Sequence, residues 1–187
     1  MPTTSSNIPD GTYAVQHKGT GKYVTAYESG KPGDQLYVYS DPGSPYSDQQ
    51  FSFKRQNDNT YIITCVNHGR AVDVAGTGTT NGTQIVQWEY SGGSNQRWFI
   101  VDVGDGYYRF VPKHTNMSMD VCENGVGNNT KIQLWTHNFS DAQKFRLISI
   151  QASAPTLSSI SIAAIPSKTG YIQNDVWMMA NLHRVKR

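Results

Sequence analysis

Carboxylate and indole side chains recur in this sequence at a fixed interval. Trp88 follows Asp73 by 15 residues, and Trp135 follows Asp120 by the same 15 residues. An indole ring can stack on the apolar face of a pyranose through dispersion and C–H contacts. A carboxylate can accept charge-assisted hydrogen bonds from two neighbouring hydroxyls. The two pairs therefore indicate shallow sites for a neutral sugar.

Carboxamide side chains accompany each pair, and a carboxamide can both donate to and accept from one hydroxyl. Ile85 and Ile132 have the opposite strand parity to the tryptophans, which favours a sugar role for the indoles over a core role. The glutamines could instead bond the backbone of their own loops, and the aspartates could cap local backbone groups. We predict two sugar sites, one of Asp73, Trp88, Asn95 and Gln96 and the other of Asp120, Gln133, Trp135 and Gln143.

Both predicted sites lie in an internal repeat. The pairs Tyr61–Tyr108, Asp73–Asp120, Trp88–Trp135 and Gln96–Gln143 are each separated by 47 residues. Chance does not account for so many chemically matched positions at one spacing. We therefore divide residues 1–150 into three units, residues 11–56, 57–103 and 104–150.

Short strands separated by turns must position these residues. Segments such as 84–88 and 131–135 are rich in β-branched and aromatic residues and follow Gly- or Asn-rich turns. No window of residues 1–150 carries a sustained helical stripe. We predict an all-β body of about four strands per unit, with pseudo-threefold symmetry and one shared core. The aromatics expected to close the units inside that core are Phe51, Trp98 and Phe145.

The repeat carries a family resemblance. Gln96-Arg97-Trp98 is similar to the Q-x-W motif of ricin B-chain-like (R-type) lectins, and Gln49-Gln50-Phe51 and Gln143-Lys144-Phe145 resemble its variants with Phe for Trp. Gln133-Leu134-Trp135 resembles the family's Q-L-W strand. The resemblance implies a β-trefoil of twelve strands, six in a barrel and six in a hairpin cap. It also implies non-catalytic binding of galactose- or N-acetylgalactosamine-type glycans, and the opening SNIPDGTY looks most like cytosolic lectins of mushrooms.

Departures from the family pattern rank the three units. In these lectins each unit can hold a pocket made by an Asp, an aromatic residue and an Asn-Gln pair. The second unit departs at Val86, where a Gln often sits, and the third at Ala142, where an Asn often sits. The first unit has Thr25 for the Asp and Tyr39 for the Trp. We rank the second site first, the third close behind it, and the first a poor third.

Composition and charge exclude several function classes. Residues 1–150 sum to −1, so this body has no electrostatic footprint for nucleic acid. No apolar run reaches 18 residues, so we expect no membrane insertion. The five His residues show no metal-ligand spacing, so we expect no metal. No G-x-S-x-G, H-E-x-x-H or C-x-x-C motif is present, so we also expect no cofactor and no catalytic residue. Cys65 and Cys122 could pair or stay free.

Residues 151–187 fall outside the repeat and sum to +3. We interpret residues 1–150 as one lectin domain and 151–187 as an extension, either packed or frayed, or forming a homodimer contact. No signal peptide is evident, so we expect a cytoplasmic protein, or one released by a non-classical route, whose partners are glycans of glycoproteins or glycolipids. Two alternatives stay open: a β-trefoil protease inhibitor acting through the loop 41–46, and the glycan-targeting module of a toxin or glycosidase.

Overall fold

The computed structural model describes residues 5–26, 29–40 and 45–150. The extension and most of the loop 41–46 lie outside these residues, so the predictions that concern them stay predictions. The described chain is all-β, as predicted, with short 3₁₀ turns between strands. No helix in these ranges is long and apolar enough to cross a bilayer. The strands are β1 Gly11–His17, β2 Tyr23–Thr25, β3 Tyr37–Tyr39, β4 Gln50–Arg55, β5 Tyr61–Cys65, β6 Ala71–Val74, β7 Thr83–Trp88, β8 Trp98–Asp102, β9 Tyr108–Pro112, β10 Ser118–Val121, β11 Thr130–Trp135 and β12 Phe145–Ser149.

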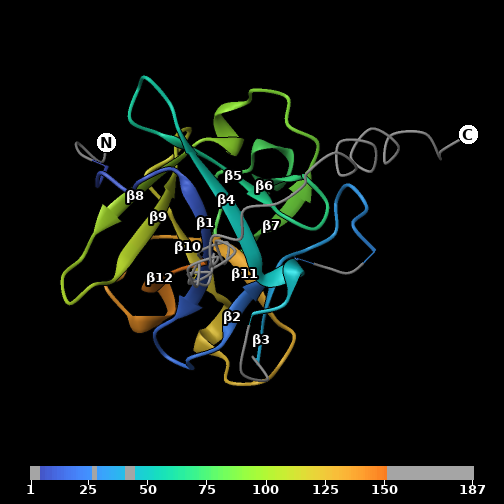
Figure 1. Cartoon of the computed structure of the whole chain (residues 1–187). Helices are drawn as coiled ribbons and strands as arrows, with labels where there is room; N and C mark the ends of the chain where they lie inside the picture. The colour runs from blue at the N-terminus through green and yellow to red at the C-terminus, as the bar shows by residue number, and fades with distance from the viewer. Residues whose placement is uncertain (1–4, 27–28, 41–44, 151–187) are drawn as a thin grey trace, which may run out of the picture. The chain divides into compact units, whose positions relative to one another are not determined.

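Six of the strands close into a barrel. β1 pairs with β4, β4 with β5, β5 with β8, β8 with β9, β9 with β12, and β12 returns to β1, all antiparallel. Each unit supplies two of these strands, which cross the body of the molecule in Figure 1. A closed ring leaves no free edge, so every unit depends on the other two.

The other six strands form three hairpins that cap the barrel. They are β2–β3, β6–β7 and β10–β11. β11 pairs with both β3 and β7, and a bridge between Gln35 and Val86 joins the first hairpin to the second. The structure therefore confirms the predicted β-trefoil, with one barrel pair and one cap hairpin from each unit.

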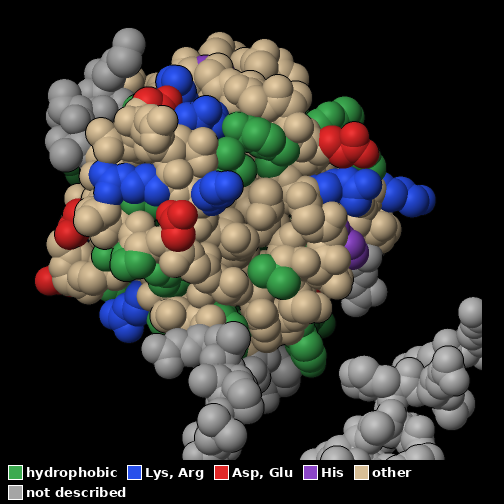
Figure 2. All heavy atoms as spheres, turned by 45° about the horizontal axis from the view of Figure 1, so that its top comes forward, with side chains coloured by type: hydrophobic (Ala, Val, Ile, Leu, Met, Phe, Trp, Pro, Cys, Tyr) green, Lys and Arg blue, Asp and Glu red, His purple; other side chains and the backbone are tan. Residues whose placement is uncertain are grey.

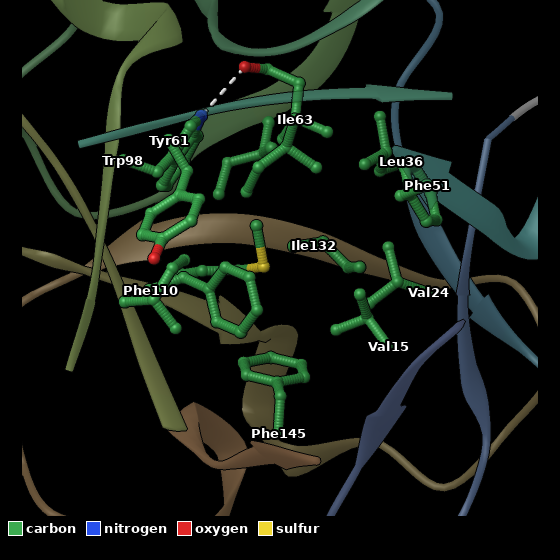
Figure 3. Close-up of a cluster of buried hydrophobic side chains, with 14 of the residues drawn as sticks. Val15, Val24, Leu36, Phe51, Tyr61, Ile63, Trp98, Phe110, Ile132 and Phe145 are labelled. Carbon is green, nitrogen blue, oxygen red and sulfur yellow. Dashed lines mark hydrogen bonds between the residues drawn. The ribbon is translucent and has the colours of Figure 1, made fainter. Parts of the chain in front are cut away.

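A single core lies between the barrel and the cap. The closing aromatics Phe51, Trp98 and Phe145 are at most 1% exposed, as predicted. Figure 3 shows them converging with Phe110 and Ile132, and the Trp98 indole donates a 2.9 Å hydrogen bond to the Val72 carbonyl. Burying each large apolar side chain contributes about 1.5–3 kcal/mol, which a lone unit could not retain.

Candidate functional site

Two cap hairpins each present an aspartate and a tryptophan on one face. In β6–β7, Asp73 lies opposite Val86, and Trp88 follows Val86 by two residues on the same strand. In β10–β11, Asp120 lies opposite Gln133, with Trp135 again two residues further on. Because side chains alternate along a strand, each Asp and Trp are diagonal neighbours on the same side of the hairpin.

The opposite face of both hairpins belongs to the core. Ile85 and Ile132 are fully buried, whereas Trp88 is 47% exposed and Trp135 is 36% exposed. The predicted parity is therefore confirmed: the isoleucines point inward and the indoles point outward. An exposed indole with a solvent-facing ring can serve as a stacking plate.

The edge of Trp88 is packed by the first unit. Gly33 has φ of +92°, and a Cβ at this position would lie 3.3 Å from Cζ3 of Trp88. The Gly33 amide also donates a 2.9 Å hydrogen bond to the Gln87 carbonyl. A loop from one unit thus helps to hold the stacking plate of the next, and the left-handed backbone favours glycine there.

A carboxamide from the following turn holds Asp73. Asn95, in the 3₁₀ turn Ser94–Gln96, donates from Nδ2 to Asp73 Oδ2 at 3.0 Å and to the Val74 carbonyl at 3.1 Å. Asp73 is only 5% exposed. Burial raises the pKa of its carboxyl group, and the amide hydrogen bonds oppose that rise. The structure therefore brings Asp73, Trp88, Asn95 and Gln96 together, since the Gln96 side chain also hydrogen-bonds to Asp73.

Two carboxamides hold Asp120. Gln133 donates to Oδ1 at 3.1 Å, and Gln143 donates to Oδ2 at 3.0 Å. Asp120 is 4% exposed, and burial raises the pKa of its carboxyl group against the effect of the same two amides. The structure therefore brings Asp120, Gln133, Trp135 and Gln143 into one cluster.

The Q-x-W glutamines brace their own loops. Gln96 is 1% exposed, donates to the Glu89 carbonyl at 2.8 Å and accepts from the Ser91 amide at 2.8 Å. Gln143 is also 1% exposed, donates to the Thr136 carbonyl at 3.0 Å and accepts from the amide of residue 138 at 3.1 Å. These bonds are the structural alternative that the sequence analysis left open. Direct contact of either glutamine with sugar stays a prediction.

The first unit departs from the other two in shape as well as chemistry. Thr25 replaces the aspartate and accepts a 3.2 Å hydrogen bond from Gln49. Beside it lies a hollow of about 1030 Å³, lined in part by Tyr37, Tyr39 and Tyr46. The sequence ranking rested on the missing carboxylate and did not anticipate this hollow. The clustering of three tyrosines within residues 37–46 was the available signal.

Metal sites, disulfides and basic surfaces would give the described residues other kinds of site chemistry. No group of three or more His, Cys, Asp or Glu residues there could hold a metal ion. Both cysteines are free thiols, and burial raises the pKa of Cys65. On the face in Figure 2, basic and acidic side chains are interspersed, so that face has no continuous basic stripe.

Comparisons with known proteins agree with this geometry. A family model described as ricin-type β-trefoil lectin domain-like matches residues 3–88 and 47–135. No curated protein sequence matches the chain. Among solved structures, the designed threefold-symmetric protein ThreeFoil is 30% identical with a TM-score of 0.71, and the match covers 75% of this chain and 100% of that protein.

Two natural proteins also share the fold. The exo-β-1,3-galactanase 1,3Gal43A of Clostridium thermocellum is 27% identical with a TM-score of 0.70, over 80% of this chain and 31% of that enzyme. The ricin B-like lectin of Macrolepiota procera, solved in complex with lactose, is 17% identical with a TM-score of 0.65, over 78% of this chain and 100% of that lectin. At 17% identity the second likeness shows the fold alone. The repeat, the closed barrel with its three hairpins and the family match together show that this chain belongs to the ricin-type β-trefoil lectin family, a family of carbohydrate-binding proteins.

Proposed function

We propose that the protein is a non-catalytic lectin that binds galactose- or N-acetylgalactosamine-type glycans on its second and third units. One observation carries the proposal. On both hairpins, an exposed indole and a buried, amide-held carboxylate share one face, at Asp73 with Trp88 and at Asp120 with Trp135. Repetition of the pair suits repeated binding better than one asymmetric acid–base pair.

The chemistry of each site follows from its parts. The indole stacks on the apolar face of the pyranose, while the carboxylate accepts hydrogen bonds from two adjacent hydroxyls. Asn95 and Gln133 hold the carboxylates in place before the sugar arrives, so little orientation is left to arrange on binding. The galactose preference comes from the family resemblance and is supported by the galactanase match, because these residues alone argue only for a neutral pyranose.

Two sites on one chain favour multivalent ligands. A shallow site that contacts one or two sugar rings binds weakly. A second site raises the overall affinity when both sites can bind glycans on the same surface. We therefore propose that the partners are clustered glycans of glycoproteins or glycolipids, and that the protein agglutinates cells that display them.

A glycan array tests the proposal. The wild type is compared with Asp73→Ala, Asp120→Ala and the double variant, with Asp102→Ala as a control because Asp102 is an exposed carboxylate outside both hairpins. We expect terminal galactose or N-acetylgalactosamine signals that weaken in each single variant and vanish in the double variant. An unchanged array for the double variant, or no signal for the wild type, would contradict the proposal.

A second candidate rests on the galactanase match. The chain covers 31% of that enzyme, so a fold of this kind occurs there within a longer chain. As a targeting module, the protein would bind an insoluble galactan and raise the local concentration of a catalytic partner. A pull-down on insoluble β-1,3-galactan, with the same double variant as control, distinguishes this role: binding to galactan but not to short array glycans would favour it.

A further inference from the structure

The third unit contains an arginine that no acidic residue in the described part of the chain compensates. Arg109 lies in β9 and is half-buried. Its Nη1 donates a 3.4 Å hydrogen bond to the Ser118 hydroxyl, and its Nε is buried without a hydrogen-bond partner. The ion pairs found among residues 5–26, 29–40 and 45–150 do not include Arg109. A guanidinium withdrawn from water without a counter-charge is costly.

A small pocket lies against this arginine. Its volume is about 160 Å³. That is below the roughly 300–1,000 Å³ of pockets that enclose whole small molecules, so it suits a substituent of a few atoms. The Ser140 hydroxyl is buried without a hydrogen-bond partner. The lining includes Val103, Arg109, His137, Phe139, Ser140 and Lys144.

The charges around the pocket sum to an excess of positive charge. Lys144 Nζ lies 2.9 Å from Asp141 Oδ1, and Lys18 Nζ lies 3.1 Å from the same oxygen. One carboxylate therefore faces two ammonium groups, and Arg109 adds a third cation. Burial lowers the pKa of His137 against the opposing hydrogen bond to Gln143, and the positive charges of Arg109 and Lys144 lower it further.

The repeat shows that the fold does not require this arginine. Subtracting the 47-residue period places Ile62 at the position of Arg109, Gly92 at that of Phe139 and Gly93 at that of Ser140. The second unit forms the same barrel strand with an apolar residue there, in β5. The second unit therefore lacks both this cation and this aromatic residue.

We propose that this pocket binds an oxyanion substituent, carboxylate or sulfate, of a glycan whose neighbouring ring occupies the Asp120 site. The pocket supplies a guanidinium, an unpaired hydroxyl and an ammonium group, and planar guanidinium matches an oxyanion with two parallel hydrogen bonds. Gln143 lines the pocket and also donates to Asp120, so the two sites share a wall. The glycan part of this inference rests on the proposed function; the oxyanion part rests on the pocket itself.

Calorimetric titration with matched glycans tests the proposal. The probes are N-acetyllactosamine, its sialylated form and its sulfated form, titrated into wild type, Arg109→Gln and Lys54→Gln. Lys54 is an exposed lysine of β4, so its variant controls for the loss of one positive charge. We expect at least one acidic form to bind the wild type about tenfold more tightly than the neutral form, the scale of one charge-assisted hydrogen bond. Arg109→Gln should remove that gain and leave neutral binding unchanged, while Lys54→Gln keeps it.

The outcomes separate this proposal from the proposed function. Equal binding of neutral and acidic forms by the wild type, or a gain that survives in Arg109→Gln, overturns the oxyanion pocket. If the wild type binds none of the glycans, the lectin function is overturned, and the oxyanion pocket is then tested by a second measurement. In that measurement, sodium sulfate is titrated at constant ionic strength while the Nε–H NMR signal of Arg109 is followed in the wild type. A saturable shift supports the pocket, and no shift overturns it; neither depends on the folding of a variant.

Discussion

The hairpins β6–β7 and β10–β11 present the same pair of functional groups by different means. Asp73 is held by Asn95 from the following 3₁₀ turn, and the residue opposite it is Val86. Asp120 is held from the opposite strand by Gln133, and by Gln143. The turn position of Asn95 is Ala142 in the third unit. The second unit lacks a carboxamide at Val86 and the third lacks one at Ala142, while Gln96 lies beside Asp73 as Gln143 lies beside Asp120.

This exchange has a physical reason. A buried carboxylate needs hydrogen-bond donors, because leaving it unpaired costs more than any single sugar contact returns. The donor can come from any neighbouring element that reaches it, since only the carboxylate and the indole must present fixed positions to the ligand. The comparison predicts two sites that bind sugar in the same way but respond differently when the hydrogen-bond donors to their aspartates are substituted.

The largest effect should follow removal of the indoles. Trp88→Ala or Trp135→Ala should weaken its own site by about 1.5–3 kcal/mol, the scale of burying a large apolar side chain, or roughly ten- to hundredfold in affinity. Because both rings are partly exposed, the melting temperature should fall less than it would on removal of a core aromatic such as Trp98. Titration of a monovalent galactoside into each single variant measures the surviving site. If only one of the two substitutions reduced the affinity for the galactoside, the two hairpins would not be equivalent binding sites.

A smaller difference is expected when the donors are removed. Asn95→Ala takes away the side-chain amide hydrogen-bonded to Asp73 and should destabilise the fold by about 1–3 kcal/mol, the cost of an unsatisfied buried polar group. Gln133→Ala should cost less, because Gln133 is only half-buried and Gln143 stays on Asp120, whereas Asn95 is buried and also donates to the Val74 carbonyl. Urea unfolding of the two variants gives the comparison. Equal losses, or a greater loss for Gln133→Ala, would show that the donor sets are not organised as described.

Adding a carboxamide opposite Asp73 should make the second site more similar to the third. Val86→Gln places a carboxamide opposite Asp73, as Gln133 lies opposite Asp120. We expect a gain of about two- to fivefold in affinity at the second site, within the net value of one hydrogen bond. Gln84→Ala, an exposed position on the same strand as Val86, serves as the control. Unchanged affinity in Val86→Gln would mean that Asn95 already suffices.

The smallest effect concerns pH. Burial raises the pKa of both Asp73 and Asp120, so each carboxyl group gains a proton at a higher pH than an exposed aspartate does. The ionised form accepts the sugar hydroxyls, so affinity should fall as pH falls through the raised pKa and recover above it. The folded-state pKa exceeds the unfolded one, so stability should decrease as pH rises through the same window. Calorimetry between pH 4 and 7, with each single Asp→Ala variant reporting on the other site, measures the two midpoints.

Much of the fold was predictable because the repeat is a property of the chain itself. Three copies of one pattern with strand periodicity cannot each bury an apolar face alone, so a shared core and threefold arrangement followed. The outward direction of Trp88 and Trp135 was predictable from their parity against Ile85 and Ile132. The rank of the first unit was harder to assess, because the hollow beside its tyrosines depends on how separate loops lie.

The sequence by itself determined an all-β body of three units and the two Asp–Trp pairs, because period and alternation are local, and the β-trefoil followed from the resemblance to ricin B-chain-like lectins. Only the tertiary structure decided which donor holds each aspartate, since Asn95 and Gln143 reach across more than 20 residues to do so. It also decided that Gly33 of the first unit packs against Trp88 of the second, and that Arg109 faces a pocket without an acidic partner among the described residues. Such contacts join residues far apart in the chain, and neither sequence spacing nor composition predicts the spatial distance between them.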